Sequence, residues 1–391
     1  MNTVPVLGRF AFLGCILVKQ RVEVGILYSQ TGGYALISNA AREGALAAIV
    51  DINADPKSNL EIVPVERDPE GNVDRYAPLC EDILRNSSAR HVIGCITSWS
   101  RKEVIPVLEK LGGTLWYSCP YEGFEANDRV VYTHACPNQH LVPLIAWVAR
   151  RHGPHGFLLG SNYIWGWETN RVARDLIADA GGEVKGERYL PLGETDVGRL
   201  VDEIRATRPS FIINHLIGPS SYAFLAAYAE LARADPYFLP NSCPVLSCNL
   251  TECELPVLEG TADGHLVAGP YFAKTAEQLQ WPLVGERRCA SSIQAAGYAS
   301  VSVLADVLAR TQVSDADGLS EAFSTRTFTT PYGPIKIDPR THHAALPVII
   351  GRVNGLEIDM LDLTESVDAD PYLSRYDRAA TFGYPRLRVV S

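Results

Sequence analysis

Strand-like and helix-like segments alternate along most of this chain. Short apolar runs at 22–28, 60–65 and 89–96 are separated by stretches with apolar residues at helical spacing, at 40–52 and 73–86. Neighbouring parallel strands need a long crossover, which is usually a helix. The alternation therefore predicts an α/β fold built on a parallel, doubly wound sheet.

The alternation restarts after Pro137. Helix-like and strand-like segments follow one another again from 140 to 267, and a long helix is expected over 290–310. The end of the chain, from Val348 to Val353 and beyond, is expected to be strand-like and then irregular. Because 391 residues exceed what one hydrophobic core usually serves, we expect two lobes.

The net charge of the chain and its distribution indicate which kinds of binding partner to expect. The net charge is −10 at pH 7, and no stretch concentrates basic residues. A nucleic-acid surface needs a concentrated basic face. Direct contact with nucleic acid is therefore not expected.

Cysteine usage bears on the cellular compartment. The nine cysteines are odd in number and show no recurring framework of spacings. An extracytoplasmic protein would be expected to pair or lose them, so the sequence favours the cytoplasm. Residues 1–20 are interpreted as a non-core N-terminal extension. The alternative is a secretion signal, suggested by Phe12-Leu-Gly-Cys15, which would make the protein periplasmic or lipid-anchored.

Motifs for cofactors and catalysis are missing from the sequence. No GxGxxG follows the first predicted strand, and there is no phosphate loop, HExxH or GxSxG. Cys243, Cys248 and Cys253 recur at a constant spacing, but zinc sites place paired ligands closer together and no fourth ligand follows. We expect no cofactor and no metal.

Polar and aromatic side chains gather where the predicted strands end. In an open parallel sheet, ligands bind beyond the carboxyl ends of the strands. The candidates, drawn from both lobes, are Thr97, Ser98, Tyr117, Cys119, Tyr163, Trp165, His215, Ile217 and Asn249. They offer hydroxyls, an amide and aromatic rings but few charges. This set suits a small neutral ligand with an amide or urea group, since an amino acid would demand charged partners.

Each candidate also has a purely structural interpretation. Ser98 is as well suited to capping the helix that follows, whose N-cap is expected at Ser100, as to contacting a ligand. Its hydroxyl can donate or accept, so it suits either end of a carboxamide. Tyr117 and Tyr163 can be boundary aromatics, and Cys119 can be a small buried apolar residue.

Several short motifs resemble a known family. They include Tyr121-Glu-Gly-Phe-Glu125, Pro137-Asn-Gln139 and Gly160-Ser-Asn-Tyr163. These motifs are similar to those of the amide-sensing negative regulator of bacterial aliphatic amidase operons, and of the urea and short-chain amide receptors of ABC importers. The resemblance implies a type I periplasmic-binding-protein fold, with two lobes, a ligand crevice between them and no catalysis.

The resemblance also implies a set of ligand contacts. They fall on Ser98, Tyr117, Cys119, Pro120, Tyr163 and Asn249, with Trp165 and Ile217 shaping the pocket. In the operon regulator the positions of Cys119 and Asn249 hold threonine, so the size of the amide stays open.

Together these arguments predict two discontinuous lobes. The N-terminal lobe takes 21–132 plus 271–345, and the C-terminal lobe takes 133–270 plus 346–391. The long helix expected at 290–310 is assigned to the N-terminal lobe, because the resemblance to the family implies that the chain returns there.

Three roles fit this fold. The first is a ligand sensor that regulates amidase or nitrile-degradation genes through an antiterminator protein. The alternative is a substrate-binding receptor that passes urea or short-chain amides to an ABC permease. The third is an amide hydrolase with Cys119 as nucleophile, for which the spacing places no base nearby. A homo-oligomer is compatible with each of them.

Overall fold

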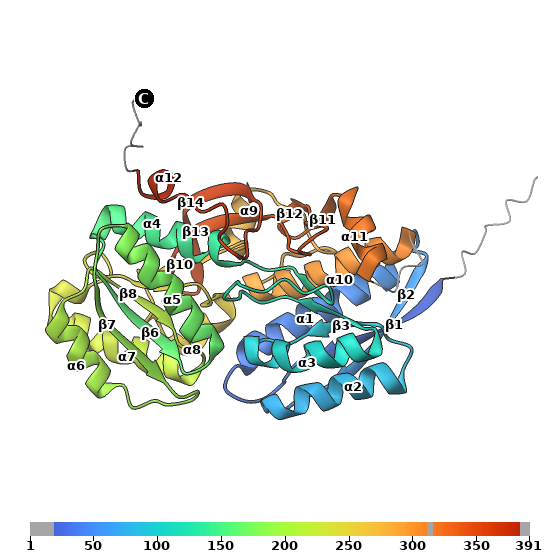
Figure 1. Ribbon diagram of the computed structural model, residues 1–391, viewed down its shortest axis with the longest axis horizontal. Coiled ribbons are helices and arrows are strands. Elements are labelled where there is room, and N and C mark those ends of the chain that lie inside the picture. Colours follow the sequence, from blue (N-terminus) through green and yellow to red (C-terminus); the bar gives the residue numbers. More distant parts are fainter. Residues whose placement is uncertain (1–18, 311–315, 384–391) are drawn as a thin grey trace, which may run out of the picture.

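The computed structural model describes residues 19–310 and 316–383. Two separate β-sheets, each flanked by helices, form two halves that lie side by side along the long axis of the molecule (Figure 1). The expected extension at 1–20 falls mostly outside the described residues. Its last residue, Gln20, begins strand β1 and so belongs to the fold.

The first sheet has five parallel strands in the order β2-β1-β3-β4-β5. The strands are β1 (Gln20–Leu27), β2 (Leu60–Arg67), β3 (His91–Gly94), β4 (Thr114–Tyr117) and β5 (Val130–Tyr132). Every residue of β3, β4 and β5 is buried. This is typical of a parallel sheet that helices cover on both faces.

Five helices belong to this half of the molecule (Figure 1). They are α1 (Ala35–Ala54), α2 (Tyr76–Asn86), α3 (Ser98–Leu111), α10 (Ser292–Arg310) and α11 (Ala316–Ser324). Helices α1 and α10 pack closely, because a Cβ on Gly297 would lie only 2.1 Å from the carbonyl oxygen of Ala41. By length and composition α10 could cross a membrane, but 67% of its apolar window is buried in the fold. It is a core helix.

The second sheet has seven strands in the order β14-β13-β10-β9-β8-β6-β7. The strands are β6 (Gly156–Ser161), β7 (Val184–Leu190), β8 (Phe211–His215), β9 (Val245–Ser247), β10 (Leu266–Gly269), β13 (Leu346–Asn354) and β14 (Glu357–Val367). The first five are parallel, whereas β13 and β14 add antiparallel pairs at one edge.

The remaining elements surround the second sheet and the connections. The helices are α4 (Leu141–His152), α5 (Ile164–Asp179), α6 (Gly198–Thr207), α7 (Pro219–Ala234), α8 (Leu255–Leu258), α9 (Ala273–Gln278) and α12 (Arg378–Phe382). Strands β11 (Phe328–Thr330) and β12 (Gly333–Ile335) form a separate hairpin.

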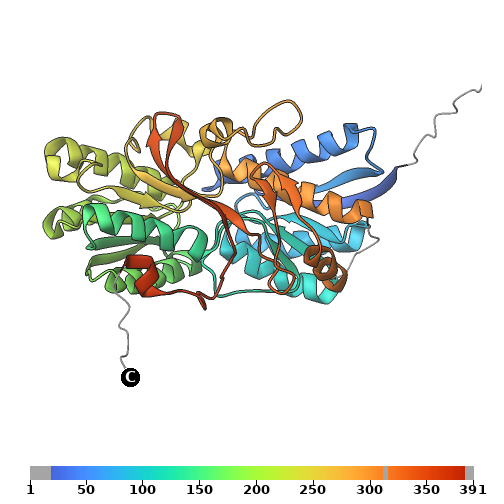
Figure 2. The ribbon, with the colours of Figure 1, turned by 90° about the horizontal axis from the view of Figure 1, so that it is seen from above.

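The chain after residue 291 contributes to both halves, through α10 and α11 in the first and through β13 and β14 in the second. Strands β13 and β14 form one edge of the second sheet, while α10 packs along α1 in the first half (Figure 2). The strand expected at Val348 to Val353 lies within β13, but the chain does not then become irregular at once, because β14 is an 11-residue strand. The exact lobe boundaries at 132, 270 and 345 stay a prediction.

Candidate functional site

A small cavity lies where the strands of the two sheets end. It encloses about 30 Å³ and is lined by Ile37, Ile96, Ser98, Cys119, Pro120, Tyr163, Trp165, Ile217, Asn249 and Ile293. The lining follows β3 and β4 of the first sheet and β6, β8 and β9 of the second. This is the place where open parallel sheets bind ligands.

Seven of the residues predicted from the sequence line this cavity. They are Ser98, Cys119, Pro120, Tyr163, Trp165, Ile217 and Asn249. Three predicted residues, Thr97, Tyr117 and His215, lie behind the lining. Sequence reasoning did not select three apolar lining residues, Ile37, Ile96 and Ile293, because isolated isoleucines carry no signal that separates a pocket wall from a core.

Thr97 is the N-cap of α3, and Ser98 is its first residue. The Thr97 hydroxyl accepts a hydrogen bond from the backbone N–H of Ser100 at 3.1 Å. The expected N-cap at Ser100 is therefore wrong. Because Thr97 provides the cap, the hydroxyl of Ser98 is not used to cap α3.

Ser98 is tied to two buried charged residues. Its hydroxyl donates to Oε2 of Glu122 and accepts from Nη1 of Arg101 at 3.3 Å. Arg101 also donates through Nη2 to Oε1 of Glu122 at 3.0 Å. Sequence reasoning did not select this pair, because 21 residues separate Arg101 from Glu122 and the fold brings them together.

Arg101 is fully buried and firmly held. Its Nε donates to Glu125 at 2.7 Å, and Lys102 contacts the same carboxylate at 2.6 Å. The guanidinium also lies 4.7 Å and 4.8 Å from the ring centres of Tyr117 and Tyr121. Two cations and two carboxylates balance within this cluster, so a buried charge is stabilised only with its partners in place.

Tyr117 and His215 support the cavity from behind. The Tyr117 hydroxyl donates to the carbonyl of Ile96 at 2.7 Å, which fixes the loop after β3. Nδ1 of His215 lies 2.9 Å from Oδ1 of Asn170, and the imidazole packs edge-on against Trp165 with ring centres 5.4 Å apart. Both residues position lining residues.

The second half contributes the other polar lining atoms. Tyr163 is 4% exposed, and its hydroxyl has no hydrogen-bond partner among the described residues. Burial raises the pKa of Tyr163 well above its usual value, so the hydroxyl keeps its proton. Within residues 19–310 and 316–383, the indole N–H of Trp165 is also buried without a partner. Both groups can therefore donate to a ligand.

The lining itself carries no charge. All ten lining side chains are neutral, and burial lowers the pKa of three nearby histidines, His134 to about 3, His140 to about 4 and His215 to about 3. These imidazoles are therefore uncharged at neutral pH. A ligand carboxylate or ammonium would enter the cavity without a partner of opposite charge.

Cys119 has none of the features of a nucleophile. Burial raises the pKa of its thiol far above the usual value, and its sulfur lies 3.9 Å from the carbonyl oxygen of Cys95. The reactive form of cysteine is the thiolate. Cys119 is therefore a small apolar part of the wall.

The two halves touch at the rim of the cavity. A Cβ on Gly218 would lie 1.9 Å from the carbonyl oxygen of Gly33, which belongs to the other half. Gly218 also has φ +58° and ψ −133°, a conformation that glycine alone adopts readily. The two halves are therefore in direct backbone contact at a position that requires glycine.

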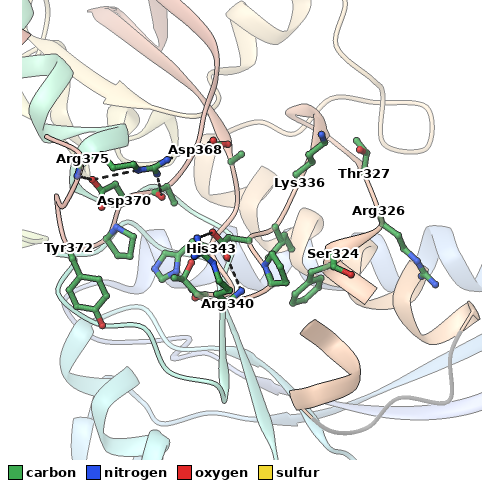
Figure 3. A pocket seen from close by; sticks show the side chains of 18 of the residues that line it. Ser324, Arg326, Thr327, Lys336, Arg340, His343, Asp368, Asp370, Tyr372 and Arg375 are labelled. Atoms are coloured by element: carbon green, nitrogen blue, oxygen red, sulfur yellow. Dashed lines mark hydrogen bonds and ion pairs between the residues drawn. The ribbon is translucent and has the colours of Figure 1, made fainter. Parts of the chain in front are cut away.

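A larger hollow lies elsewhere and is a weaker candidate. It measures about 690 Å³ and is lined by segments 323–327, 336–345 and 368–375 (Figure 3). Its carboxylates are used locally: Asp338 accepts from the backbone of Arg340 at 2.8 Å, and Asp370 accepts from that of Arg375 at 2.6 Å. It receives none of the strand ends that face the smaller cavity, so the smaller cavity is the better candidate for the ligand site.

The family of the chain follows from its sequence as well as its fold. Residues 22–378 match the family model described as the periplasmic binding protein domain. The chain belongs to this family, and the predicted type I periplasmic-binding-protein fold is confirmed.

Individual relatives are distant. The Leu/Ile/Val-binding protein homolog 6 of Brucella abortus is 22% identical over 349 residues, with 85% of this chain and 87% of that protein covered. A solute binding protein of an ABC transporter from Rhodopseudomonas palustris HaA2, in complex with p-hydroxybenzoic acid, superposes with a TM-score of 0.75 at 20% identity, covering 88% of this chain and 97% of that one. LivJ from Streptococcus pneumoniae, in complex with isoleucine, superposes with a TM-score of 0.72 at 15% identity. The match covers 88% of this chain and 99% of that one.

These findings define a small-molecule solute-binding protein. Solute-binding proteins of this family are not enzymes, so the expected lack of catalysis is confirmed. The expected cytoplasmic location is wrong, because the family is periplasmic.

The number of cysteines led to the wrong compartment, and the burial of these residues explains why. The eight cysteines among the described residues are unpaired, and seven are buried. Burial raises the pKa of Cys243 to about 11 and that of Cys80 to about 12. Such thiols hardly form the reactive thiolate, so their number does not report the redox state of the compartment.

Proposed function

We propose that this protein is the substrate-binding receptor of an ABC importer and that it binds a small neutral amide or urea. The observation that carries the ligand class is the cavity between the sheets, whose ten lining residues are all uncharged. The importer role is supported by the family and by relatives described as parts of ABC transporters.

The size of the cavity supports a very small ligand. A water molecule needs roughly 10–15 Å³ of such space, so about 30 Å³ holds only two or three waters. Urea and acetamide have few non-hydrogen atoms and approach this size. A benzoate ring or an isoleucine side chain would need a more open form of the site.

The amino-acid and aromatic-acid ligands of the similar structures suit this site less well. Isoleucine carries an ammonium and a carboxylate, and p-hydroxybenzoic acid carries a carboxylate. The lining offers neither charge, and Arg101 is already neutralised by Glu122 and Glu125. Burying an unpaired charge is strongly unfavourable.

The importer role is tested by disrupting the gene in its host. The account predicts that uptake of radiolabelled urea or acetamide at low concentration is lost and is restored by the intact gene. Unchanged uptake combined with altered expression of amidase genes would instead support the sensor role and contradict the proposal.

A further inference from the structure

The hydroxyl of Ser98 has little freedom left in this structure. A serine hydroxyl has one proton to donate and two lone pairs to accept with. The proton is directed at Oε2 of Glu122, and one lone pair receives Nη1 of Arg101 at 3.3 Å. One acceptor position therefore remains for the cavity that Ser98 lines.

The partners that hold the Ser98 proton cannot easily release it. Glu122 is 2% exposed, and its other oxygen is held by Arg101 at 3.0 Å. If Ser98 turned its proton toward a ligand, this buried carboxylate oxygen would lose a hydrogen bond, which is unfavourable. Arg101 is fixed in turn by Glu125 at 2.7 Å and by the rings of Tyr117 and Tyr121.

We propose that Arg101 and Glu122 are positioning residues that orient the Ser98 hydroxyl, so that Ser98 can only accept and the ligand must present an N–H group to it. This inference rests on the proposed function, and it names the end of the ligand that Ser98 binds. A carboxylate ligand would set its own acceptor oxygen against an acceptor. An amide or urea NH₂ group supplies the missing donor.

The opposite wall complements this polarity. The hydroxyl of Tyr163 has no partner among the described residues and keeps its proton, so it can donate to a carbonyl oxygen. A carboxamide thus meets an acceptor at Ser98 and a donor at Tyr163. Acetate has the same shape but no N–H group, so it can accept from Tyr163 but cannot donate to Ser98.

The test compares acetamide with acetate by calorimetry in the full-length protein and in two variants. Glu122→Gln removes the carboxylate that takes the Ser98 proton and provides an NH₂ that can donate to Ser98 instead. We expect the ratio of the acetate to the acetamide dissociation constant to fall at least tenfold. The matched control is Glu125→Gln, which removes the same charge from Arg101 but does not touch Ser98, and should keep the ratio within about threefold of the wild type.

The outcomes separate the two proposals. If the ratio of dissociation constants fell equally in both variants, charge alone would set the preference for acetamide over acetate. If the ratio did not change in Glu122→Gln, Glu122 would not orient Ser98. Either result would overturn the positioning role while leaving amide binding intact. If the wild type bound neither acetamide nor urea, the proposed ligand class itself would fail.

A second variant keeps the test decisive if Glu122→Gln does not fold, which thermal unfolding will show. Ser98→Ala removes the acceptor, so acetamide binding should weaken roughly three- to tenfold, the range of a neutral hydrogen bond. Acetate binding should not weaken. Equal weakening of both ligands would contradict an acceptor role for Ser98.

Discussion

Two tyrosines that the sequence could not distinguish have different environments. The hydroxyl of Tyr117 donates to Ile96 O at 2.7 Å, whereas that of Tyr163 has no partner among the described residues. Tyr163→Phe should therefore weaken amide binding by about 0.5–1.5 kcal/mol and leave stability nearly unchanged. Calorimetry and thermal unfolding measure the two effects.

Tyr117→Phe serves as the matched control. It should lower the free energy of unfolding by about 1 kcal/mol and change ligand affinity less than Tyr163→Phe does. The opposite pattern would place Tyr117, and not Tyr163, against the ligand.

The acid sensitivity of the protein should depend on Glu125. Burial by itself would raise the pKa of this carboxyl, but Arg101 and Lys102 lower it to about 2 from the usual 4.5. A lowered pKa in the folded state stabilises the protein above pH 4.5, and this stability is lost as the pH falls toward 2. The loss should be on the order of 3 kcal/mol.

Thermal unfolding at pH 6 and at pH 3 measures this effect. Glu125→Gln cannot titrate, so its stability should fall less between the two pH values than that of the wild type. Equal losses in both proteins would show that Glu125 is not the responsible group.

At the residue scale, the sequence predicted most of the wall but not its electrostatics. Ser98, Cys119 and Tyr163, which were selected from predicted strand ends, line one cavity, because parallel strands deliver their carboxyl ends to one edge. The pairing of Arg101 with Glu122 depends on tertiary structure. A usable signal was present, since Arg101 follows Ser98 by three residues and so shares its face of α3.

Among the elements, α3 depends on the cap that Thr97 provides. Thr97→Ala removes the acceptor for the backbone N–H of Ser100 and should lower the free energy of unfolding by about 0.5–2 kcal/mol. Thr97→Ser keeps the hydroxyl and should restore most of this loss. Equal destabilisation by the two substitutions would indicate that the threonine methyl group matters and the cap does not.

The sequence predicted the interior strands well and the edge strand poorly. Strands such as β3 and β4 are buried throughout, so they appear as continuous apolar runs. The outermost strand β14 has only one buried residue, Ile358, and pairs with β13 through two register shifts. Its largely polar sequence carries little apolar pattern, and its strand conformation depends on β13.

For the molecule as a whole, we expect the approach of the two halves to depend on the contact of Gly218 with Gly33. Gly218→Ala would place a Cβ 1.9 Å from the Gly33 carbonyl oxygen and so oppose this approach. Overlap of this kind costs about 1–3 kcal/mol, so ligand affinity should fall roughly tenfold or more. Small-angle scattering should also show a smaller ligand-induced compaction.

A second glycine provides the control for backbone strain. Gly193 also has a positive φ, +84°, but a Cβ there would meet nothing within 4 Å. Gly193→Ala should therefore destabilise the fold without changing affinity or compaction. A loss of affinity in Gly193→Ala that matched the loss in Gly218→Ala would contradict the role of the contact in the approach of the two halves.

The central claim is that an uncharged site between the two halves selects a small neutral amide or urea. Isothermal titration calorimetry with urea, acetamide, benzoate and isoleucine under one set of conditions tests it most directly. The account predicts binding of urea or acetamide and none of benzoate or isoleucine at the same concentrations, because the ten lining residues offer no charge to a carboxylate. Tight binding of benzoate or isoleucine, with no binding of urea or acetamide, would contradict it.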